Sequence, residues 1–193
     1  MPFIRSALIA ASVAASIVAF SQGAAFAADT LNLQLKDGNV AIELNPSLAP
    51  KHVAQIEKLV KEGAYNGVAF HRVIPGFMAQ TGDVKFGNMD KGFNASSVGT
   101  GGSELPNIPA EFSKEPFVRG TVGMARSQDP NSANSQFFIM FNEGSFLNGQ
   151  YTVVGKVVSG MDVVDKIKKG NESDNGSVEN PDKIIKATIE AGK

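Results

Sequence analysis

Hydrophobic and polar residues alternate along much of the chain after residue 28, and this period of two is typical of half-buried β-strands. Residues 31–36 and 39–44 both alternate, and Asp37-Gly38 between them is a strong signal for a hairpin turn. Several later runs have the same strand character and are separated by Gly, Pro, Asn or Asp. These further predicted strands span residues 68–74, 77–83, 120–125, 135–141, 151–158 and 183–190.

Two segments change to the helical period of 3.6 residues, the first over residues 49–63 and the second over residues 159–170. Both have residue types that favour helix ends. These are Pro50 and Gly63 in the first helix, and in the second Ser159 as N-cap, Asp162 as its capping-box-like partner and Gly170 as the stop. About eight short strands and two helices predict a mainly β domain, either a sandwich or a barrel whose open ends the helices can cover.

The first 27 residues form a separate segment. One positive charge, Arg5, precedes an apolar or small stretch over residues 6–20, and Ala25-Phe26-Ala27 matches an A-x-A cleavage pattern. The apolar stretch is about 15 residues long, which is shorter than the ~20 residues of a membrane-spanning helix. We therefore predict a secretory signal peptide over residues 1–27, cleaved near Ala27, and a periplasmic or secreted domain over residues 28–193. If the signal is not cleaved, it becomes a membrane anchor.

Composition narrows the possible functions. The chain has 193 residues, a net charge of -1 and no cysteine, so it fits one soluble domain without disulfides and without the basic surface that nucleic acid requires. It contains no HExxH, no GxSxG and no zinc-ligand spacing. The glycine-rich loop after residue 95 lacks the lysine and the spacing of a phosphate-binding loop. We expect no metal, no cofactor and no nucleic-acid partner.

Two stretches contain residues that are unusual for simple strands. "FHRVIPGFMAQTGD", residues 70–83, places Arg72 in an apolar run, although a strand arginine taken alone is more typical of a surface ion pair. In "SQFFIMF", residues 135–141, alternation predicts a core face with Phe137, Ile139 and Phe141, and an opposite face with Gln136, Phe138 and Met140. A glutamine beside a phenylalanine fits a binding surface and ordinary mixed packing equally well. His52 and His71 are isolated in sequence, which is more typical of structural or surface histidines than of a catalytic base.

Longer motifs carry a family resemblance. "FHRVIPGFMAQTGD" and "ARSQDPNSANSQFFI" resemble the two signature segments of cyclophilins, the peptidyl-prolyl cis–trans isomerases, and "SFLNGQYTVVGKVVSGMDVVDKI" resembles the family's third segment. The resemblance covers residues 31–189, and the predicted signal peptide makes the chain similar to a bacterial exported member. It implies a closed, eight-stranded antiparallel barrel capped by two α-helices, with a substrate groove on the outer face of the barrel.

The resemblance also implies an activity, which is acceleration of rotation about X-Pro bonds in exported proteins to assist their folding. Its partners would be proline-containing segments of unfolded or folded proteins, and we expect the enzyme to be a monomer. The implied catalytic residues are Arg72 and Gln80, and the implied substrate-binding residues are Phe77, Met78, Ala125, Arg126, Gln136, Phe138, Phe146, Leu147 and Tyr151. A cation, an amide and an apolar pocket suffice for such a rotation, because no covalent bond is broken.

Three positions depart from the commonest eukaryotic pattern of the family. Phe146 stands where many members have a tryptophan that is linked to tight cyclosporin binding, so the resemblance leaves sensitivity to this drug open. Tyr151 stands where many have histidine, and it keeps an aromatic ring with a polar tip. Arg126 stands where many have asparagine, and the loop after it is one residue longer.

Two alternative functions share parts of this pattern. A binding module or chaperone would use the same groove without turnover, and the presence of both Arg72 and an apolar pocket favours turnover over this alternative. A lipocalin-like carrier of apolar ligands would need a hollow barrel, whereas the bulky Phe137, Ile139 and Phe141 predict a filled one.

Overall fold

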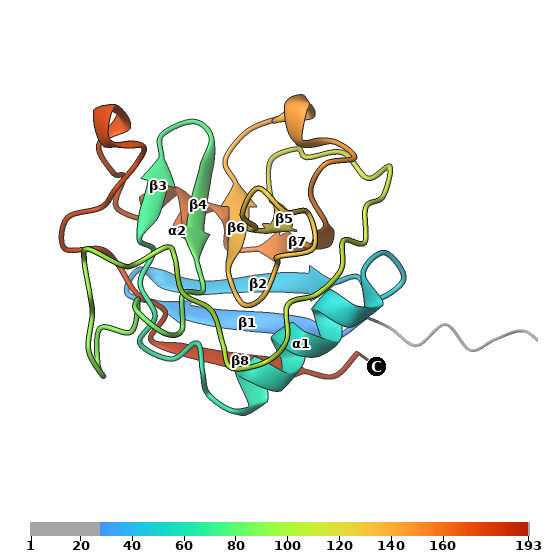
Figure 1. Cartoon of the computed structure of the whole chain (residues 1–193), viewed down its shortest axis with the longest axis horizontal. Helices are drawn as coiled ribbons and strands as arrows, with labels where there is room; N and C mark the ends of the chain where they lie inside the picture. The colour runs from blue at the N-terminus through green and yellow to red at the C-terminus, as the bar shows by residue number, and fades with distance from the viewer. Residues whose placement is uncertain (1–27, 193) are drawn as a thin grey trace, which may run out of the picture.

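The computed structural model describes residues 28–192, so the predicted signal peptide over residues 1–27 lies outside the described residues. Eight strands, two α-helices and two short 3₁₀-helices follow one another along the chain (Figure 1). The strands are β1 (Thr30–Leu35), β2 (Gly38–Leu44), β3 (Arg72–Ile74), β4 (Met78–Thr81), β5 (Thr121–Met124), β6 (Phe137–Met140), β7 (Val153–Ser159) and β8 (Lys186–Glu190). The helices are α1 (Pro50–Lys61), η1 (Ser145–Leu147), α2 (Met161–Lys166) and η2 (Glu172–Asp174).

All eight strands belong to one curled antiparallel sheet with the order β3-β4-β6-β5-β7-β2-β1-β8. In Figure 1, β1, β2 and β8 form its lower part and the other strands its upper part. Helix α1 packs against β8, and α2 packs against β2. The predicted class, mainly β with eight antiparallel strands and two helices, is confirmed.

Closure of the barrel was overstated by the sequence analysis. Within residues 28–192 the edge strands β3 and β8 do not pair, so the sheet is a curled half-barrel. The reason is that residues 170–178 occupy the free edge of β3. The amide of Val73 donates a hydrogen bond to the carbonyl of Gly176 at 2.7 Å, and the amide of Gly170 donates to the carbonyl of Val73 at 2.8 Å. A separate link joins the segments before the two edge strands, where the amide of Phe70 donates to the carbonyl of Asp182 at 2.8 Å.

The predicted N-terminus of α2 was wrong. Ser159 is the last residue of β7, and the N-cap is Gly160, with no capping side chain. Gly160 has a φ of 87°, and a Cβ atom there would clash with the carbonyl oxygen of Asn39. The chain therefore turns from strand to helix at a position that only glycine fits. The helix ends at Lys166, four residues before Gly170, which instead bonds to β3.

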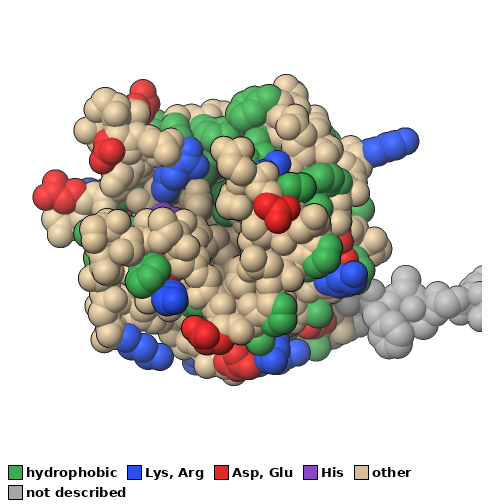
Figure 2. Space-filling view, in the orientation of Figure 1, with side chains coloured by type: hydrophobic (Ala, Val, Ile, Leu, Met, Phe, Trp, Pro, Cys, Tyr) green, Lys and Arg blue, Asp and Glu red, His purple; other side chains and the backbone are tan. Residues whose placement is uncertain are grey.

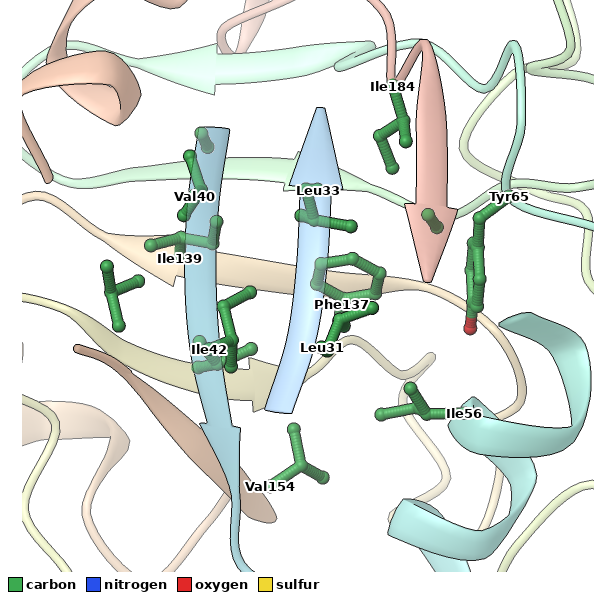
Figure 3. Packing of buried hydrophobic residues seen from close by; sticks show 14 of the residues in the cluster. Leu31, Leu33, Val40, Ile42, Ile56, Tyr65, Phe137, Ile139, Val154 and Ile184 are labelled. Carbon is green, nitrogen blue, oxygen red and sulfur yellow. The ribbon is translucent and has the colours of Figure 1, made fainter. Parts of the chain in front are cut away.

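The main hydrophobic core lies on the concave side of the sheet and is filled (Figure 3). In Figure 3, Leu33 of β1 and Ile42 of β2 lie in one cluster with Phe137 and Ile139 of β6. All four side chains are fully buried. Phe141 joins the same cluster, so the predicted core face of the "SQFFIMF" stretch is confirmed, and the filled interior is unlike that of a hollow carrier.

A second, smaller hydrophobic cluster lies on the opposite face of β4, β5, β6 and β7. Its buried members are Met78, Phe117, Phe138, Met140, Leu147 and Val153. Successive residues of a strand point to opposite faces, so the same short strands that fill the core also build this outer cluster. The candidate site lies over it.

Candidate active site

Strand register aligns the central side chains of the site. Arg72 of β3 lies opposite Gln80 of β4, Gln80 lies opposite Phe138 of β6, and Phe138 lies opposite Gly123 of β5. Directly opposed residues on neighbouring strands project from the same face of a sheet. A cation, an amide and an aromatic ring are therefore placed in one row across three strands.

Gly123 makes room for the aromatic floor of the site. The rings of Phe117 and Phe138 stack, with centroids 5.7 Å apart and an interplanar angle of 23°. A Cβ atom on Gly123 would lie 2.5 Å from Phe117 Cε1 and 2.6 Å from Phe138 Cζ. Since both distances are shorter than any ordinary contact, only glycine allows this stack.

A cavity of about 220 Å³ opens over this floor. It is lined by all but one of the site residues that the sequence analysis named: Arg72, Phe77, Met78, Gln80, Ala125, Arg126, Phe138, Phe146, Leu147 and Tyr151. The sequence segments around residues 72–80, 125–138 and 146–151 thus meet at one place, as the resemblance implies. In Figure 2, hydrophobic side chains gather at the upper edge of the molecule, over the ends of β4 and β6, with Lys or Arg side chains beside them.

Aromatic rings form the walls of the cavity. Phe77 and Phe146 lie with their centroids 5.4 Å apart, and Tyr151 meets Phe138 edge-on at 5.9 Å. Phe138 is buried, whereas 64% of Phe146 is exposed. Phe146 therefore lies at the rim of the cavity, where one part of its ring packs against Phe77 and the rest is exposed to solvent.

Arg72 is held from two sides. Its Nη1 donates a hydrogen bond to Oε1 of Gln80 at 3.1 Å. On the other side, its Nε donates to the backbone carbonyl of Asn175 at 3.0 Å, and its Nη2 donates to Asn175 Oδ1 at 2.9 Å. Partial burial lowers the pKa of Arg72, and the proximity of Tyr151 acts in the opposite direction. A guanidinium nevertheless stays charged at any physiological pH.

Gln136, the one predicted site residue that does not line this cavity, connects the side-chain amide of Gln80 to the glycine-rich loop. Its Oε1 accepts a hydrogen bond from Nε2 of Gln80 at 2.9 Å, and its own Nε2 donates to the carbonyls of Gly99 and Gly101 at 3.0 and 2.7 Å. The amides of these two glycines donate in turn to Oδ2 of buried Asp83, at 2.7 and 3.0 Å. Gln80 is thus fixed by a chain of hydrogen bonds that begins at a buried carboxylate.

A second cavity, of about 340 Å³, adjoins the first along this chain of bonds. The two cavities share Gln80, Ala125 and Arg126. The other lining residues of the second cavity are Gly99, Thr100, Gly101, Ser127, Ser132, Asn134, Ser135 and Gln136. The site is therefore an elongated groove with one apolar and one polar compartment, and the glycine-rich loop forms part of the polar one.

Arg126 lies between the two compartments and is turned toward the protein. Its guanidinium carbon lies 4.4 Å from the ring centroid of Tyr151. Its Nε and Nη2 both donate to the carbonyl of Gln150, at 3.2 and 3.0 Å, and its Nη1 donates to the carbonyl of Ser127 at 2.9 Å. Arg126 therefore joins the segments on both sides of the groove and fixes the ring of Tyr151.

Both histidines are buried and neither lines the two cavities. His52 Nδ1 lies 2.7 Å from Oε2 of Glu111, so His52 is a structural residue at the start of α1. Neither ring nitrogen of His71 has a hydrogen-bond partner within residues 28–192. Over the same residues, no group of three or more His, Cys, Asp or Glu side chains is placed to hold a metal ion, and no helix has the length and apolar character to cross a membrane.

Asn175, Asp83 and the Gly99–Gly101 segment contact the site but were not named from the sequence. The Asn175-Gly176 pair is a recognisable turn signal, but a turn signal does not say which distant residue the turn will contact. Asp83 ends the first signature stretch, and its role as an acceptor for loop amides becomes visible only in three dimensions.

Comparisons with known proteins show the family to which this chain belongs. Residues 30–189 match the family model described as "Cyclophilin type peptidyl-prolyl cis-trans isomerase/CLD". A "Probable peptidyl-prolyl cis-trans isomerase" of Brucella suis is 78% identical, over 99% of this chain and 98% of that protein. A "Peptidyl-prolyl cis-trans isomerase" of Acinetobacter baylyi is 40% identical, over 80% of this chain and 81% of that protein.

Two crystal structures have a similar fold. Cyclophilin AquaCyp293 from Hirschia baltica has a TM-score of 0.68 and 30% identity, covering 82% of this chain and 73% of that one. A Cryptosporidium parvum cyclophilin-type isomerase, crystallised in the presence of the dipeptide Ala-Pro, has a TM-score of 0.70 and 25% identity, covering 83% of this chain and 98% of that one.

The fold of this chain, an eight-stranded half-barrel, is thus shared with a known class of enzymes. The chain belongs to the cyclophilin-type peptidyl-prolyl cis–trans isomerases. It is an isomerase that acts on prolyl peptide bonds.

Proposed function

We propose that the apolar cavity holds the proline ring of a peptide while Arg72 stabilises the twisted prolyl amide. The observation that carries this proposal is the position of the Arg72 guanidinium on the wall of a cavity whose other walls are mainly apolar. The partners we propose are proline-containing segments of unfolded or folded proteins. The Cryptosporidium relative crystallised in the presence of Ala-Pro supports this class of substrate.

The reaction needs stabilisation of an unusual amide nitrogen. The barrier to rotation, ~20 kcal/mol, comes from amide resonance. When the bond is twisted, resonance is lost and the nitrogen becomes pyramidal and basic. A donor directed at this nitrogen stabilises the twisted state more than either planar state, and such a difference accelerates the step. Of the five N–H groups of Arg72, three bond to Gln80 and Asn175 and one points to the sulfur of Met78 at 4.0 Å, so one remains for this purpose.

The apolar residues supply binding and a low local dielectric. Burying a ring of the size of proline against Met78, Phe138 and Leu147, all nearly fully buried themselves, is worth roughly 1–3 kcal/mol. Exclusion of water from the cavity also strengthens the interaction between the guanidinium and the nitrogen. With the ring held, the preceding part of the peptide rotates against it.

Replacement of Arg72 tests the role of the guanidinium. Arg72→Ala is expected to lower turnover of a prolyl peptide by ~100-fold or more, the effect of losing one transition-state donor. Turnover is measured by a protease-coupled assay, and circular dichroism checks the fold. Arg119→Ala is the matched control, because Arg119 forms a surface ion pair with Asp165 at 2.7 Å and lines neither cavity. Wild-type turnover by Arg72→Ala would rule out the proposed role.

We also propose that the enzyme is exported and assists the folding of other exported proteins. The supporting observations are the short apolar stretch over residues 6–20 and the A-x-A pattern that ends at Ala27. N-terminal sequencing of protein purified from the producing cell is expected to begin at Ala28. A sequence that begins at Met1 would show that the segment is not cleaved.

A further inference from the structure

The contact between Arg72 and Asn175 joins residues that are far apart in sequence and connects the cavity wall to the loop after α2. Asn175 offers two oxygens to the guanidinium: its backbone carbonyl accepts from Nε and its Oδ1 accepts from Nη2. Gln80 accepts from Nη1 on the other side. Two residues from different segments therefore fix the plane of the guanidinium.

The backbone of Asn175 is in a conformation that is unfavourable for most residues. Its φ is 49° and its ψ is 30°, which is the left-handed region, where asparagine is one of the few side chains that is tolerated. Asn175 follows the single turn of η2, and Asn171 caps that turn by accepting a hydrogen bond from the amide of Ser173 at 3.0 Å. The left-handed turn directs both oxygens of Asn175 toward the same cation.

The loop is attached firmly to the strand that carries Arg72. The amide of Val73 donates to the carbonyl of Gly176 at 2.7 Å, and the amide of Val178 donates to the carbonyl of His71 at 3.2 Å. A Cβ atom on Gly176 would lie 2.5 Å from Ile74 Cγ1, so loop and strand are in close contact. Asn175 is thus held at a fixed place relative to Arg72.

We propose that Asn175 is a positioning residue for the isomerisation, which orients the Arg72 guanidinium toward the nitrogen of the twisted amide. This inference rests on the function proposed above for Arg72. An unheld guanidinium can rotate about its side-chain bonds, and small misplacements of a catalytic group lower turnover strongly. Asn175 does not line the cavity that would hold the peptide. Its loss should therefore lower kcat by about tenfold and leave KM nearly unchanged.

Asn175→Gly removes Oδ1 and keeps the backbone carbonyl, and glycine adopts a positive φ without strain. Asn180→Gly is a matched control, because Asn180 has a φ of 50°, lies in the same loop and makes no bond to Arg72. Both variants place a glycine at a backbone position with a similar positive φ. Only Asn175→Gly is expected to lower kcat, measured at saturating peptide by NMR exchange.

The same two substitutions are then made in an Arg72→Ala background, at an enzyme concentration that brings the residual turnover into range. If Asn175 acts through Arg72, Asn175→Gly causes no further loss there. Wild-type kcat for Asn175→Gly, or an equal loss in both backgrounds, would overturn the inference. If Arg72→Ala alone keeps wild-type turnover, the proposed role of Arg72 is wrong. This outcome can be told apart from failure of the Asn175 inference, because it is measured in a variant that retains Asn175.

Discussion

At the scale of single residues, neighbouring residues determine how much space each side chain of the site has and which hydrogen bonds it makes. Gly123 leaves the space in which Phe117 and Phe138 stack beneath the cavity. Arg126 is bonded to backbone carbonyls on both sides of the groove. Arg126, which departs from the commonest family pattern, is therefore held by local hydrogen bonds and still lines both compartments of the groove.

Phe146 allows a test of drug binding at one residue. Phe146→Trp adds ring area at an exposed rim position that already contacts Phe77. One further aromatic contact is worth ~1 kcal/mol, so cyclosporin is expected to inhibit about fivefold more tightly while turnover of a small prolyl peptide changes little. Inhibition curves for the two proteins provide the measurement. Equal inhibition of both would place the weakness elsewhere in the groove, with Arg126 as the next position to change.

His71 predicts a pH dependence of stability. Burial lowers the pKa of His71, and the nearby carboxylate of Asp83 acts in the opposite direction. Below the ordinary histidine pKa of 6.5, the unfolded chain binds a proton at this residue that the folded protein resists. The unfolded state then holds more protons, so the free energy of unfolding falls as the pH drops below that value, until the lower pKa of the folded state is reached.

Urea unfolding at pH 7 and at pH 5.5 measures this effect. The free energy of unfolding of the wild type is expected to be lower at pH 5.5, and the decrease is expected to be smaller in His71→Gln, which has no titrating ring. Since His52 is present in both proteins, the difference between the two decreases belongs to His71. Equal decreases would contradict the prediction.

At the scale of elements, the N-terminus of α1 is stabilised by a residue from a distant loop. The N-cap Ala49 has no side chain that can accept a hydrogen bond. Glu111 replaces it, because Oε2 of Glu111 accepts from the amides of Lys51 and His52 at 3.1 and 3.2 Å. A carboxylate at this end also interacts favourably with the helix dipole. The long loop before β5 is thereby attached to the helix.

Removal of this carboxylate should loosen both elements. Glu111→Ala is expected to lower the free energy of unfolding by about 1–3 kcal/mol, since it leaves two helix amides and buried His52 without a partner. Glu115→Ala, in the same loop and exposed, is the control. Urea unfolding of both variants at pH 7 gives the comparison, and equal effects would show that Glu111 is not a cap.

The elements also show how far sequence patterns reach. Alternation correctly predicted the core face of β6, because one face of that strand packs in the main core and the other in the smaller outer cluster. It overestimated the length of β3, because Val68 and Ala69 contact other segments through isolated bridges outside a regular ladder. The predicted N-cap of α2 was wrong because the backbone of Gly160 lies close to that of Asn39, and this contact requires glycine at the turn. A contact of this kind leaves no periodic pattern in the sequence.

At the scale of the whole molecule, the motifs predicted which residues would meet but not what holds them. The three sequence segments converge on one cavity as the family resemblance implies. The contact of Arg72 with Asn175 and the cover over the edge of β3 both depend on the path of residues 170–178. That path is set by turns and glycines in a polar segment, and its docking partner is about a hundred residues earlier in the chain.

The sheet edges support the prediction of a monomer. The edge of β3 is occupied by residues 170–178, and the other edge strand, β8, is short and carries exposed Lys186 and Glu190. Covered edges and charged edge residues both disfavour pairing between copies. We expect light scattering after size exclusion to give the mass of one chain at micromolar concentration. A concentration-independent dimer would contradict this expectation.

The position of Asn175 and β8 late in the chain bears on biosynthesis. During translation, Arg72 leaves the ribosome long before Asn175, and β1 leaves it long before its partner β8. A nascent polypeptide therefore lacks one support of Arg72 and one strand of its sheet until residues 175–190 have been synthesised. Because the domain folds as a unit, we expect the fully supported site, and with it full turnover, to form only after these residues have left the ribosome.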